Sequence, residues 1–588
     1  MIDKYYNGVI EQVYNHVGTT EKNIVMANYN NDFSIKNLET VKRYRAQMDS
    51  VFFASREFGY RELTGAYEPF LDIICDMFRA YGTGDFDAFL DGCGVYELHK
   101  EILRSYYESG ICKRNENVLL NEVAYEQNRM TEAMTAMLKA LAKEHPLMLV
   151  INRFQMASRS TFELVHDLIA HPDKNIGLVL GVNDSVGRKE SVADMWDSIV
   201  ESLKDRSQLY NIGSSDHRRT EIAREHALGE GYTDNVDVDE DYEASIQKVS
   251  NIVEFLDYDQ AKRYFREVEY QIKFEDARMK NASRRAFYLL YAKTSILLGE
   301  LSKALELLTE AENLIPAEYE FKYRAELDFL RGTCYMYQGK LDRAERYADQ
   351  SYTRAVESGD ERAVFRAELL KVMAQMSGWY NIFFCVQDIP IESELIEKLI
   401  QYDYQNHLAH IYIYAYDNQP NVVAKAYRSE AALFYFSKGV ALAKKIGNEQ
   451  LVYDAYQKNI MLASTNGMNE IALLYSVRTY EFVTKDRCFY EGRMFSGIGY
   501  NLSAMGKNEL AEQYYNHSIQ IFYELGKSED IAEVYYNRSL NYMMQEQFKE
   551  AEHDLLFVMK VIEKLHLNSL RVCNLSKLYA LLALIGIM

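Results

Sequence analysis

Short apolar runs alternate with longer amphipathic stretches over the first 215 residues. The runs lie at 24–27, 51–54, 147–151, 176–182 and, more weakly, 209–212. Helical periodicity is found between them, at 67–81, 125–143 and 160–169. Apolar runs separated by amphipathic helices are typical of buried parallel strands. The pattern therefore predicts an α/β domain with a parallel sheet over residues 19–215, preceded by an N-terminal helix at 1–18.

From residue 241 to the end, helical periodicity dominates and small residues recur at fixed offsets. Near the C-terminus, one set recurs forty residues later: Gly499, Gly506, Ala511, Tyr515 and Ser518, then Ser539, Glu546, Ala551, Leu555 and Val558. The same offsets occur in two earlier sets, at 292, 299, 304, 308 and 311 and at 332, 339, 344, 348 and 351. A small residue lets two antiparallel helices approach closely, and a glycine seven residues later turns the chain between them.

This spacing resembles that of tetratricopeptide repeats. It predicts a mainly α protein, in which the sheet domain is followed by a C-terminal helical superhelix of about seven or eight helix pairs over residues 241–588. The last repeat is expected to be incomplete, because its turn position is Gly586 and the sequence stops at Met588. Its apolar helix, with Leu578 and Leu582, is expected to pack against another molecule or against a continuation of the natural chain.

The segment at 216–240 is polar and acidic, which indicates a linker. Asp237, Asp239 and Asp241 have the alternate spacing of a calcium loop. However, Tyr242 stands where such a loop needs glycine, and Lys248 where it needs a bidentate glutamate. A solvated turn is the preferred interpretation.

Composition limits the classes of function. The net charge of −21 argues against direct nucleic-acid binding, which needs a basic surface. The seven cysteines lack a CxxC pair and are expected to be reduced thiols. We expect a cytoplasmic protein without a membrane partner, because the N-terminus resembles no secretion signal and no apolar run reaches the roughly 18 residues of a membrane span.

The order of elements in the first region resembles the STAND class of signalling NTPases, and in particular the ATP-dependent LuxR-type transcriptional activators. The stretch 146–158, PLMLVINRFQMAS, is similar to their strand carrying the Walker B acids, and 60–63 and 67–70 are similar to their entry into the next helix. The resemblance covers about residues 20–215. It implies a P-loop domain followed by helical repeats that sense an inducer. It also implies a C-terminal helix-turn-helix, which is not visible in this sequence.

Both nucleotide motifs are altered. The segment after the first strand, NNDFSIKN at 30–37, keeps only the lysine of GxxxxGK[ST]. The positions of the Walker B acids hold an amide and a cation. The remnants of the nucleotide site are thus Asn30, Lys36, Asn37, Asn152 and Arg153. We expect a structural domain without ATP hydrolysis, so no enzyme, no cofactor and no catalytic residue; nucleotide binding without turnover is the alternative.

If the repeats follow the usual geometry, the first helix of each pair lines the concave face. This register places Lys293, Tyr337, Arg493, Tyr500 and Tyr536 toward the groove. Aromatic rings with Arg and Lys suit a peptide, a sugar or an acidic segment. No metal is expected, and His407 and His410, three residues apart, are interpreted as partly exposed surface residues.

The sequence leads to one main hypothesis and two alternatives. The main hypothesis is a non-enzymatic regulatory or sensor protein, related to transcription regulators, that binds a small molecule, a peptide or a protein through its repeats. The alternatives are a scaffold that binds proteins or peptides, and a nucleotide-binding switch. Self-association through the C-terminal helix is a further prediction.

Overall fold

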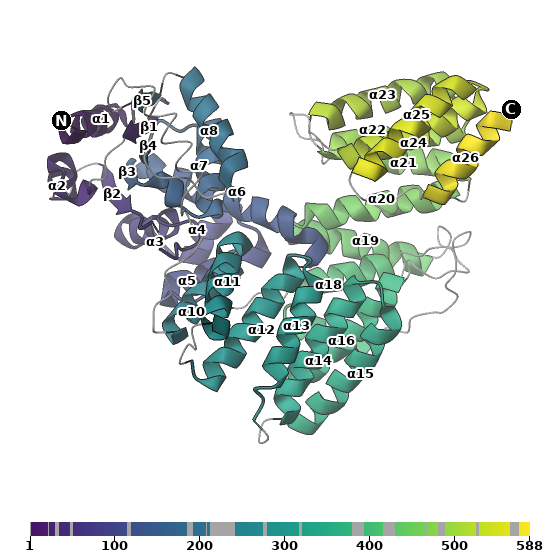
Figure 1. Cartoon of the computed structure of the whole chain (residues 1–588), viewed down its shortest axis with the longest axis horizontal. Coiled ribbons are helices and arrows are strands. Elements are labelled where there is room, and N and C mark those ends of the chain that lie inside the picture. Colours follow the sequence, from purple (N-terminus) through teal and green to yellow (C-terminus); the bar gives the residue numbers. More distant parts are fainter. Residues whose placement is uncertain are drawn as a thin grey trace. The chain divides into compact units, whose positions relative to one another are not determined.

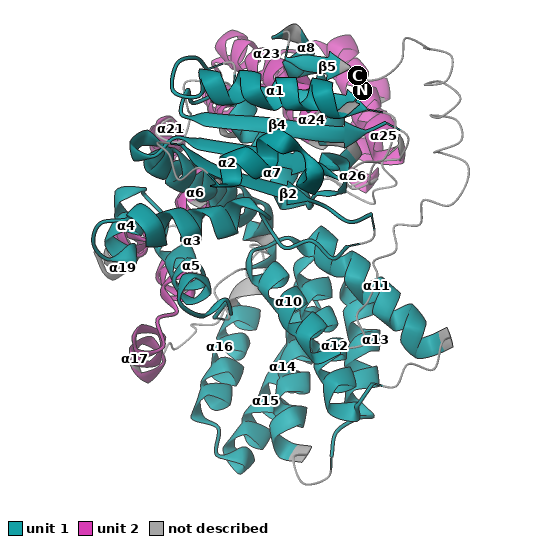
Figure 2. Cartoon of the chain, turned by 90° about the vertical axis from the view of Figure 1, so that its left-hand side faces the viewer, with its two compact units in different colours: residues 1–378 teal, residues 379–588 magenta. Residues whose placement is uncertain are grey.

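The computed structural model describes most of the chain in two compact units, residues 1–378 and 379–588 (Figure 1, Figure 2). The described residues are 2–21, 23–29, 34–46, 51–60, 62–113, 119–184, 192–206, 208–211, 242–274, 279–316, 320–378, 393–415, 430–465, 467–479, 489–524, 528–564 and 575–587. The predicted acidic linker at 216–240 and the candidate residue Asn30 lie outside them.

The first unit contains a five-stranded parallel sheet in the order β2-β3-β4-β1-β5. Its strands are β1 (Ile24–Tyr29), β2 (Phe52–Glu57), β3 (Leu147–Asn152), β4 (Ile176–Asn183) and β5 (Leu209–Asn211). Each coincides with a predicted apolar run. The central strands β3 and β4 are buried along their whole length, which explains why they lack alternation in the sequence.

Helices cover both faces of this sheet. On one face lie α1 (Ile2–His16) and α2 (Glu39–Ala46), which pack on alternate strand residues such as Val25, Val150 and Val179 (Figure 2). Two glycines on β4 let α1 come close, since a Cβ on Gly177 would lie 2.5 Å from Val17 and one on Gly181 would overlap the Tyr6 hydroxyl. The predicted N-terminal helix is therefore an integral layer of the sheet domain.

The other face packs against α3 (Phe70–Tyr81), α6 (Val123–Glu144), α7 (Arg159–Ala170) and α8 (Ala193–Asp205). The remaining short elements are α4 (Phe86–Gly92), α5 (Glu97–Ser109) and three 3-10 turns, η1 (Ile35–Asn37), η2 (Leu120–Glu122) and η3 (Phe154–Met156). The helical stretches predicted at 67–81, 125–143 and 160–169 correspond to α3, α6 and α7.

The first unit continues into repeat helices. They are α10 (Tyr242–Glu254), α11 (Tyr258–Phe274), α12 (Asn281–Leu297), α13 (Leu301–Glu312), α14 (Glu320–Tyr337), α15 (Leu341–Ser358) and α16 (Glu361–Gly378). The second unit holds α17 (Ser393–Gln401), α18 (Gln405–His410), the π-helix η6 (Ile411–Ala415), α19 (Glu430–Lys445), α20 (Glu449–Thr465), α21 (Asn469–Arg478), α22 (Phe489–Ala504), α23 (Asn508–Glu524), α24 (Ser528–Met544), α25 (Phe548–Lys564) and α26 (Leu575–Ile587).

The repeat offsets have the physical basis that the sequence predicts. The turn between paired helices has a left-handed residue at Leu256, Gly299, Gly339, Asp403, Gly467, Gly506 and Glu546. Six of these seven turns show the paired backbone hydrogen bonds of a Schellman ending, for example Gly506 N to Ser503 O and Lys507 N to Leu502 O. The small residue earlier in the first helix is a close-approach point: a Cβ on Gly499 would lie 2.9 Å from the Tyr515 ring.

One apolar core connects the sheet domain to the first repeats. It extends from Ile24 and Leu149 of the sheet through Phe265 and Ala292 to Cys334 of α14. The compact units therefore divide the chain after α16 rather than at the predicted linker. A repeat array can share a core with the domain before it, so the predicted domain boundaries stay a prediction. The fold class, a parallel α/β domain followed by helical repeats, is confirmed.

Candidate functional site

The first candidate site is the carboxyl edge of the sheet, where open α/β folds bind their ligands. Here Tyr29, the last residue of β1, donates its hydroxyl hydrogen to Asn152 Oδ1 at 2.7 Å, and both side chains are buried. Asn183, at the end of β4, donates to the Tyr60 hydroxyl at 3.0 Å. The position of the family's metal-linked acid thus holds an amide on β3 that is hydrogen-bonded to the end of β1, on the far side of β4.

Arg153, the second altered Walker B position, has a left-handed backbone with φ 56° and turns back over the sheet edge. Its guanidinium donates to the Phe58 carbonyl oxygen at 3.1 Å and lies 4.7 Å from the centre of the Tyr60 ring. It also forms an ion pair with Glu57, at 3.3 Å between Nη1 and Oε1. Both charged side chains are largely buried, with 14% and 10% exposure.

Glu57 connects Arg153 to the segment that follows β1. Its Oε2 accepts hydrogen bonds from the Ser34 hydroxyl at 3.0 Å and from the Ile35 backbone N–H at 2.8 Å. In a P-loop, backbone N–H groups of this segment surround the phosphates. In this chain the protein's own carboxylate receives such an N–H group.

The structure therefore connects some of the predicted nucleotide remnants and separates others. Arg153 is joined to the segment after β1 through Glu57, and Asn152 bonds to β1 itself. Lys36 and Asn37 belong to η1 and are exposed. Sequence reasoning missed Glu57, because only the pairing of β2 with β3 brings the end of β2 beside Arg153.

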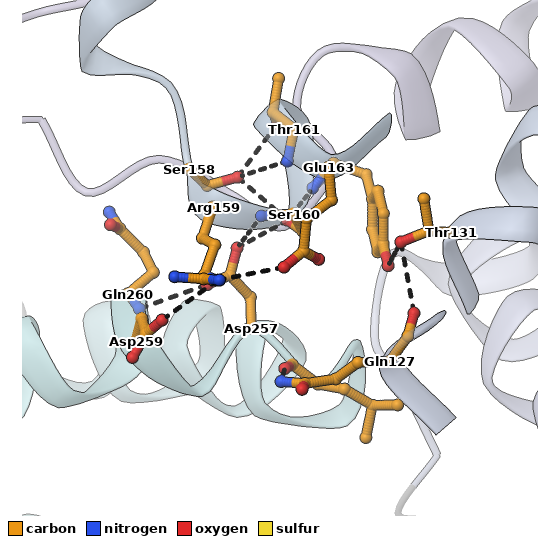
Figure 3. A network of polar contacts seen from close by, with 12 residues as sticks. Gln127, Thr131, Ser158, Arg159, Ser160, Thr161, Glu163, Asp257, Asp259 and Gln260 are labelled. Carbon is orange, nitrogen blue, oxygen red and sulfur yellow. Dashed lines mark hydrogen bonds and ion pairs between the residues drawn. The ribbon is translucent and has the colours of Figure 1, made fainter. Parts of the chain in front are cut away.

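A second polar site joins the sheet domain to the repeats (Figure 3). Asp257, 4% exposed, precedes α11 and accepts hydrogen bonds from the Ser160 N–H at 3.1 Å and the Ser160 hydroxyl at 2.6 Å at the start of α7. Its other oxygen accepts the Gln260 N–H at 3.3 Å. Ser160 also accepts the Tyr67 N–H at 2.9 Å. We call Asp257, Ser160 and Gln260 the Asp257 clasp.

The third candidate site is the predicted groove, which is described in each unit separately. In the first unit, Lys293 of α12 forms an ion pair with Glu326 of α14 at 2.7 Å, and Glu326 pairs with Arg366 of α16 at 2.9 Å. The Arg366 guanidinium lies 4.1 Å from the centre of the Phe329 ring. These contacts form a ladder of charged side chains across three first helices of successive pairs.

Tyr337 lies at the end of the same helix series but is covered by the sheet domain. Its hydroxyl accepts the Leu120 N–H at 3.2 Å. Burial raises the pKa of Tyr337 to about 12. A ligand would therefore have to displace the chain at η2 to reach this ring.

In the second unit, the three predicted groove residues differ in accessibility. Arg493 of α22 forms an ion pair with Asp530 of α24 at 2.9 Å and is 25% exposed. Tyr500 is 44% exposed, whereas Tyr536 is buried in the core of α24, α25 and α26. Tyr500 and Arg493 thus have surface that a ligand can contact, whereas Tyr536 serves as a packing residue.

No family model matches the chain, and no curated protein matches it in sequence. Several solved structures are similar. NprR in complex with its cognate peptide NprX has 15% identity and a TM-score of 0.34, over 60% of this chain and 84% of NprR. A Rap protein complexed with competence and sporulation factor has 13% identity and a TM-score of 0.32, over 63% of this chain and 97% of the Rap protein.

A STAND protein with a tetratricopeptide repeat sensor from Pyrococcus horikoshii has 12% identity and a TM-score of 0.28, over 96% of this chain and 91% of that protein. The similarity is one of fold alone. The similar solved structures thus include a STAND protein with tetratricopeptide repeats, in agreement with the predicted resemblance.

Other candidate features take definite places in the structure. His407 and His410 are both 7% exposed, so the interpretation as partly exposed residues was wrong; they pack within the second unit. Among the described residues, no three His, Cys, Asp or Glu side chains are grouped as metal ligands. In the same part of the chain, no helix has the length and apolar character that crossing a membrane requires.

Proposed function

We propose that this chain is a non-enzymatic regulatory protein whose repeats bind a peptide or protein segment and whose sheet domain is structural. The observation that carries the second part is the Glu57 carboxylate. It accepts a backbone N–H at 2.8 Å in the segment that would surround a phosphate, and its partner Arg153 occupies a Walker B position. The backbone N–H that a phosphate would need is therefore already occupied by the protein's own carboxylate.

Mg-ATP binding by the full chain tests this proposal directly. A ligand at 100 times its dissociation constant stabilises a protein by about 2.7 kcal/mol, which thermal unfolding detects. We expect millimolar Mg-ATP to leave the melting temperature unchanged. A rise of several degrees, or ATP hydrolysis above that of a Glu57→Ala, Arg153→Ala control, would support the nucleotide switch instead.

The charged ladder on α12, α14 and α16 supports the peptide-binding part. Lys293 and Arg366 both pair with the carboxylate of Glu326, so two cationic side chains lie together on the first helices of successive pairs in a protein of net charge −21. Phe329 adds an aromatic surface beside it. Helical repeats bind extended partners along such faces. We therefore propose an extended peptide segment with acidic side chains as the ligand class.

Selection of random displayed peptides on the full chain tests the ligand class. We expect the selected peptides to be enriched in Asp and Glu and to bind the Lys293→Ala variant at least fivefold more weakly. Tyr352→Ala is the matched control, because Tyr352 lies on α15, a second helix, and is 42% exposed. Neutral or basic peptides that bind Lys293→Ala as well as the wild type would contradict the proposal.

The location and assembly of the protein stay predictions. We propose a cytoplasmic protein without a cofactor and without direct nucleic-acid contact. The link to transcription rests on the sequence resemblance. We propose self-association through α26, because Tyr579 is 57% and Leu584 46% exposed on this apolar helix. A dimer in light scattering that Leu584→Lys converts to a monomer would support it, and a wild-type monomer would refute it.

A further inference from the structure

The Asp257 clasp lies within a cluster of charged side chains from α7 and from the start of the repeats (Figure 3). Arg159 and Glu163 come from α7, whereas Asp257 and Asp259 come from the start of α11. The Arg159 Nε lies 3.0 Å from Glu163 Oε1 and 3.6 Å from Asp259 Oδ2. The Arg159 guanidinium thus lies near two of the three carboxyl groups, and the buried Arg263 guanidinium donates to the Gln260 side-chain oxygen at 3.3 Å.

The carboxylates differ in how well their charge is compensated. Asp257 is buried and accepts three hydrogen bonds, from Ser160 and Gln260. Asp259 is 41% exposed to water. Glu163 has a largely buried side chain, with 28% exposure, and faces Asp257. Glu163 is therefore a largely buried carboxyl group that contacts the Arg159 guanidinium and also faces a second buried carboxyl group.

We propose that the Asp257 clasp is a proton-sensitive connection between the sheet domain and the repeats, which is held when Glu163 is protonated and loosened when Glu163 is ionised. An ionised Glu163 repels Asp257, the acceptor that joins the start of α7 to the start of α11. Neutral Glu163 leaves Arg159 and Asp259 as a balanced pair. This connection is independent of which ligand the repeats bind.

Burial, with added repulsion from Asp257 and Asp259, raises the pKa of Glu163 from its ordinary value of 4.5 to about 7 despite the nearby Arg159. Tyr67, which also faces this cluster, contributes no charge, because burial raises the pKa of its hydroxyl well above the ordinary value. A raised carboxyl pKa in the folded state means that stability is present at low pH and falls as pH rises between 4.5 and 7.

The hydrogen bonds of the Asp257 clasp continue to residues on either side of it. Ser160 accepts the Tyr67 N–H, and Thr161 donates its hydroxyl hydrogen to the Glu68 carbonyl oxygen at 2.9 Å. The loop before α3, the start of α7 and the start of α11 thus share one hydrogen-bond network. Loosening Asp257 would release the first repeat from two segments of the sheet domain together.

Hydrogen exchange of the full chain at several pH values tests the proposal. The readout is the amide exchange rate of peptides from 156–165 and 255–265, divided by the rate of the same peptides in the Glu163→Gln variant at the same pH. This ratio removes the intrinsic pH dependence of amide exchange. If opening restores the ordinary pKa, the ratio should rise roughly 30-fold between pH 5.5 and pH 8.5. Glu144→Gln, at the exposed end of α6, is the matched control and should keep the wild-type profile.

A ratio that stays constant with pH would overturn the proposal. Asp257→Asn provides an independent second test, because the amide still accepts one hydrogen bond but no longer repels Glu163. We expect this variant to exchange faster than wild type at pH 5.5 and to show a reduced pH step, because the burial of Glu163 remains but the repulsion by Asp257 is gone. If Asp257→Asn retains the full step, Asp257 is not the group on which Glu163 acts, and the proposal fails.

Discussion

Replacing Glu57 by alanine removes the carboxylate that joins β2, β3 and the segment after β1. The change deletes two hydrogen bonds to a charged acceptor, from Ser34 and Ile35, and leaves Arg153 largely buried without its ion-pair partner. Hydrogen bonds to charged groups contribute about 1.5–3 kcal/mol each but are not additive. Since Arg153 keeps the Phe58 carbonyl and the Tyr60 ring, we expect a loss of about 3 kcal/mol in the free energy of unfolding.

Tryptophan fluorescence offers an assay that is specific to the first unit. The chain has two tryptophans, Trp196 and Trp379. Trp196 lies on α8, with its ring centre 6.0 Å from that of Phe162 in the sheet-domain core. In a Trp379→Phe background, urea unfolding followed by fluorescence therefore reports on the sheet domain. The expected result is a lower midpoint with an unchanged slope.

Two further variants calibrate the loss of stability expected for Glu57→Ala. Glu57→Gln should lose less stability, about 1–2 kcal/mol, because an amide oxygen can still accept the Ile35 N–H. Glu39→Ala should stay within about 0.5 kcal/mol of wild type. Glu39 is 85% exposed, and its ion pair with Arg43 is long, at 3.9 Å. A Glu57→Ala loss no larger than that of Glu39→Ala would refute the role given to the carboxylate.

Three further predictions concern the repeats. Gly506→Ala should cost about 1 kcal/mol in urea unfolding, because φ is +73° and the new Cβ would meet nothing within 4 Å, whereas Glu546→Gly at the equivalent turn should be neutral or stabilising; equal losses would contradict this. Asp554→Ala should cost about 3–5 kcal/mol, since the 2% exposed carboxylate forms two 2.8 Å contacts to Arg538; a loss below about 1 kcal/mol in urea unfolding would contradict it. Hydrogen bonding to an arginine holds the pKa of Glu312 below its ordinary value, so its contribution is present above pH 4.5 and lost as pH falls below it; the melting-temperature difference between wild type and Glu312→Gln should therefore shrink from pH 6 to pH 3.

The strands and the repeat turns could be predicted because each depends on local chemistry. A buried parallel strand requires a continuous apolar run, and residues 176–182 match β4 within one residue. A turn between paired helices requires a left-handed residue, and glycine supplies it at positions 299, 339 and 506. Even Glu546, where glycine is missing, takes the left-handed backbone that the forty-residue spacing assigns to it.

The candidate sites depend on pairings that no local pattern contains. Glu57 ends a strand that looks unremarkable in sequence, and its importance arises only because β2 lies beside β3. Tyr337 fits the groove register, but a segment more than two hundred residues earlier, at Leu120, covers it. His407 and His410 are buried because neighbouring helices enclose α18, which spacing alone does not indicate.

The shared core from the sheet to α14 has a consequence for how the protein can be divided. A fragment that ends after β5 would expose apolar side chains of the shared core such as Tyr106 of α5, because partners such as Phe255 would be missing. Such a fragment should aggregate, whereas one that ends at residue 378 keeps the whole core. The repeats up to α16 are accordingly not an interchangeable module: any exchange of repeat arrays between chains of this architecture would have to include the sheet domain or begin after that helix.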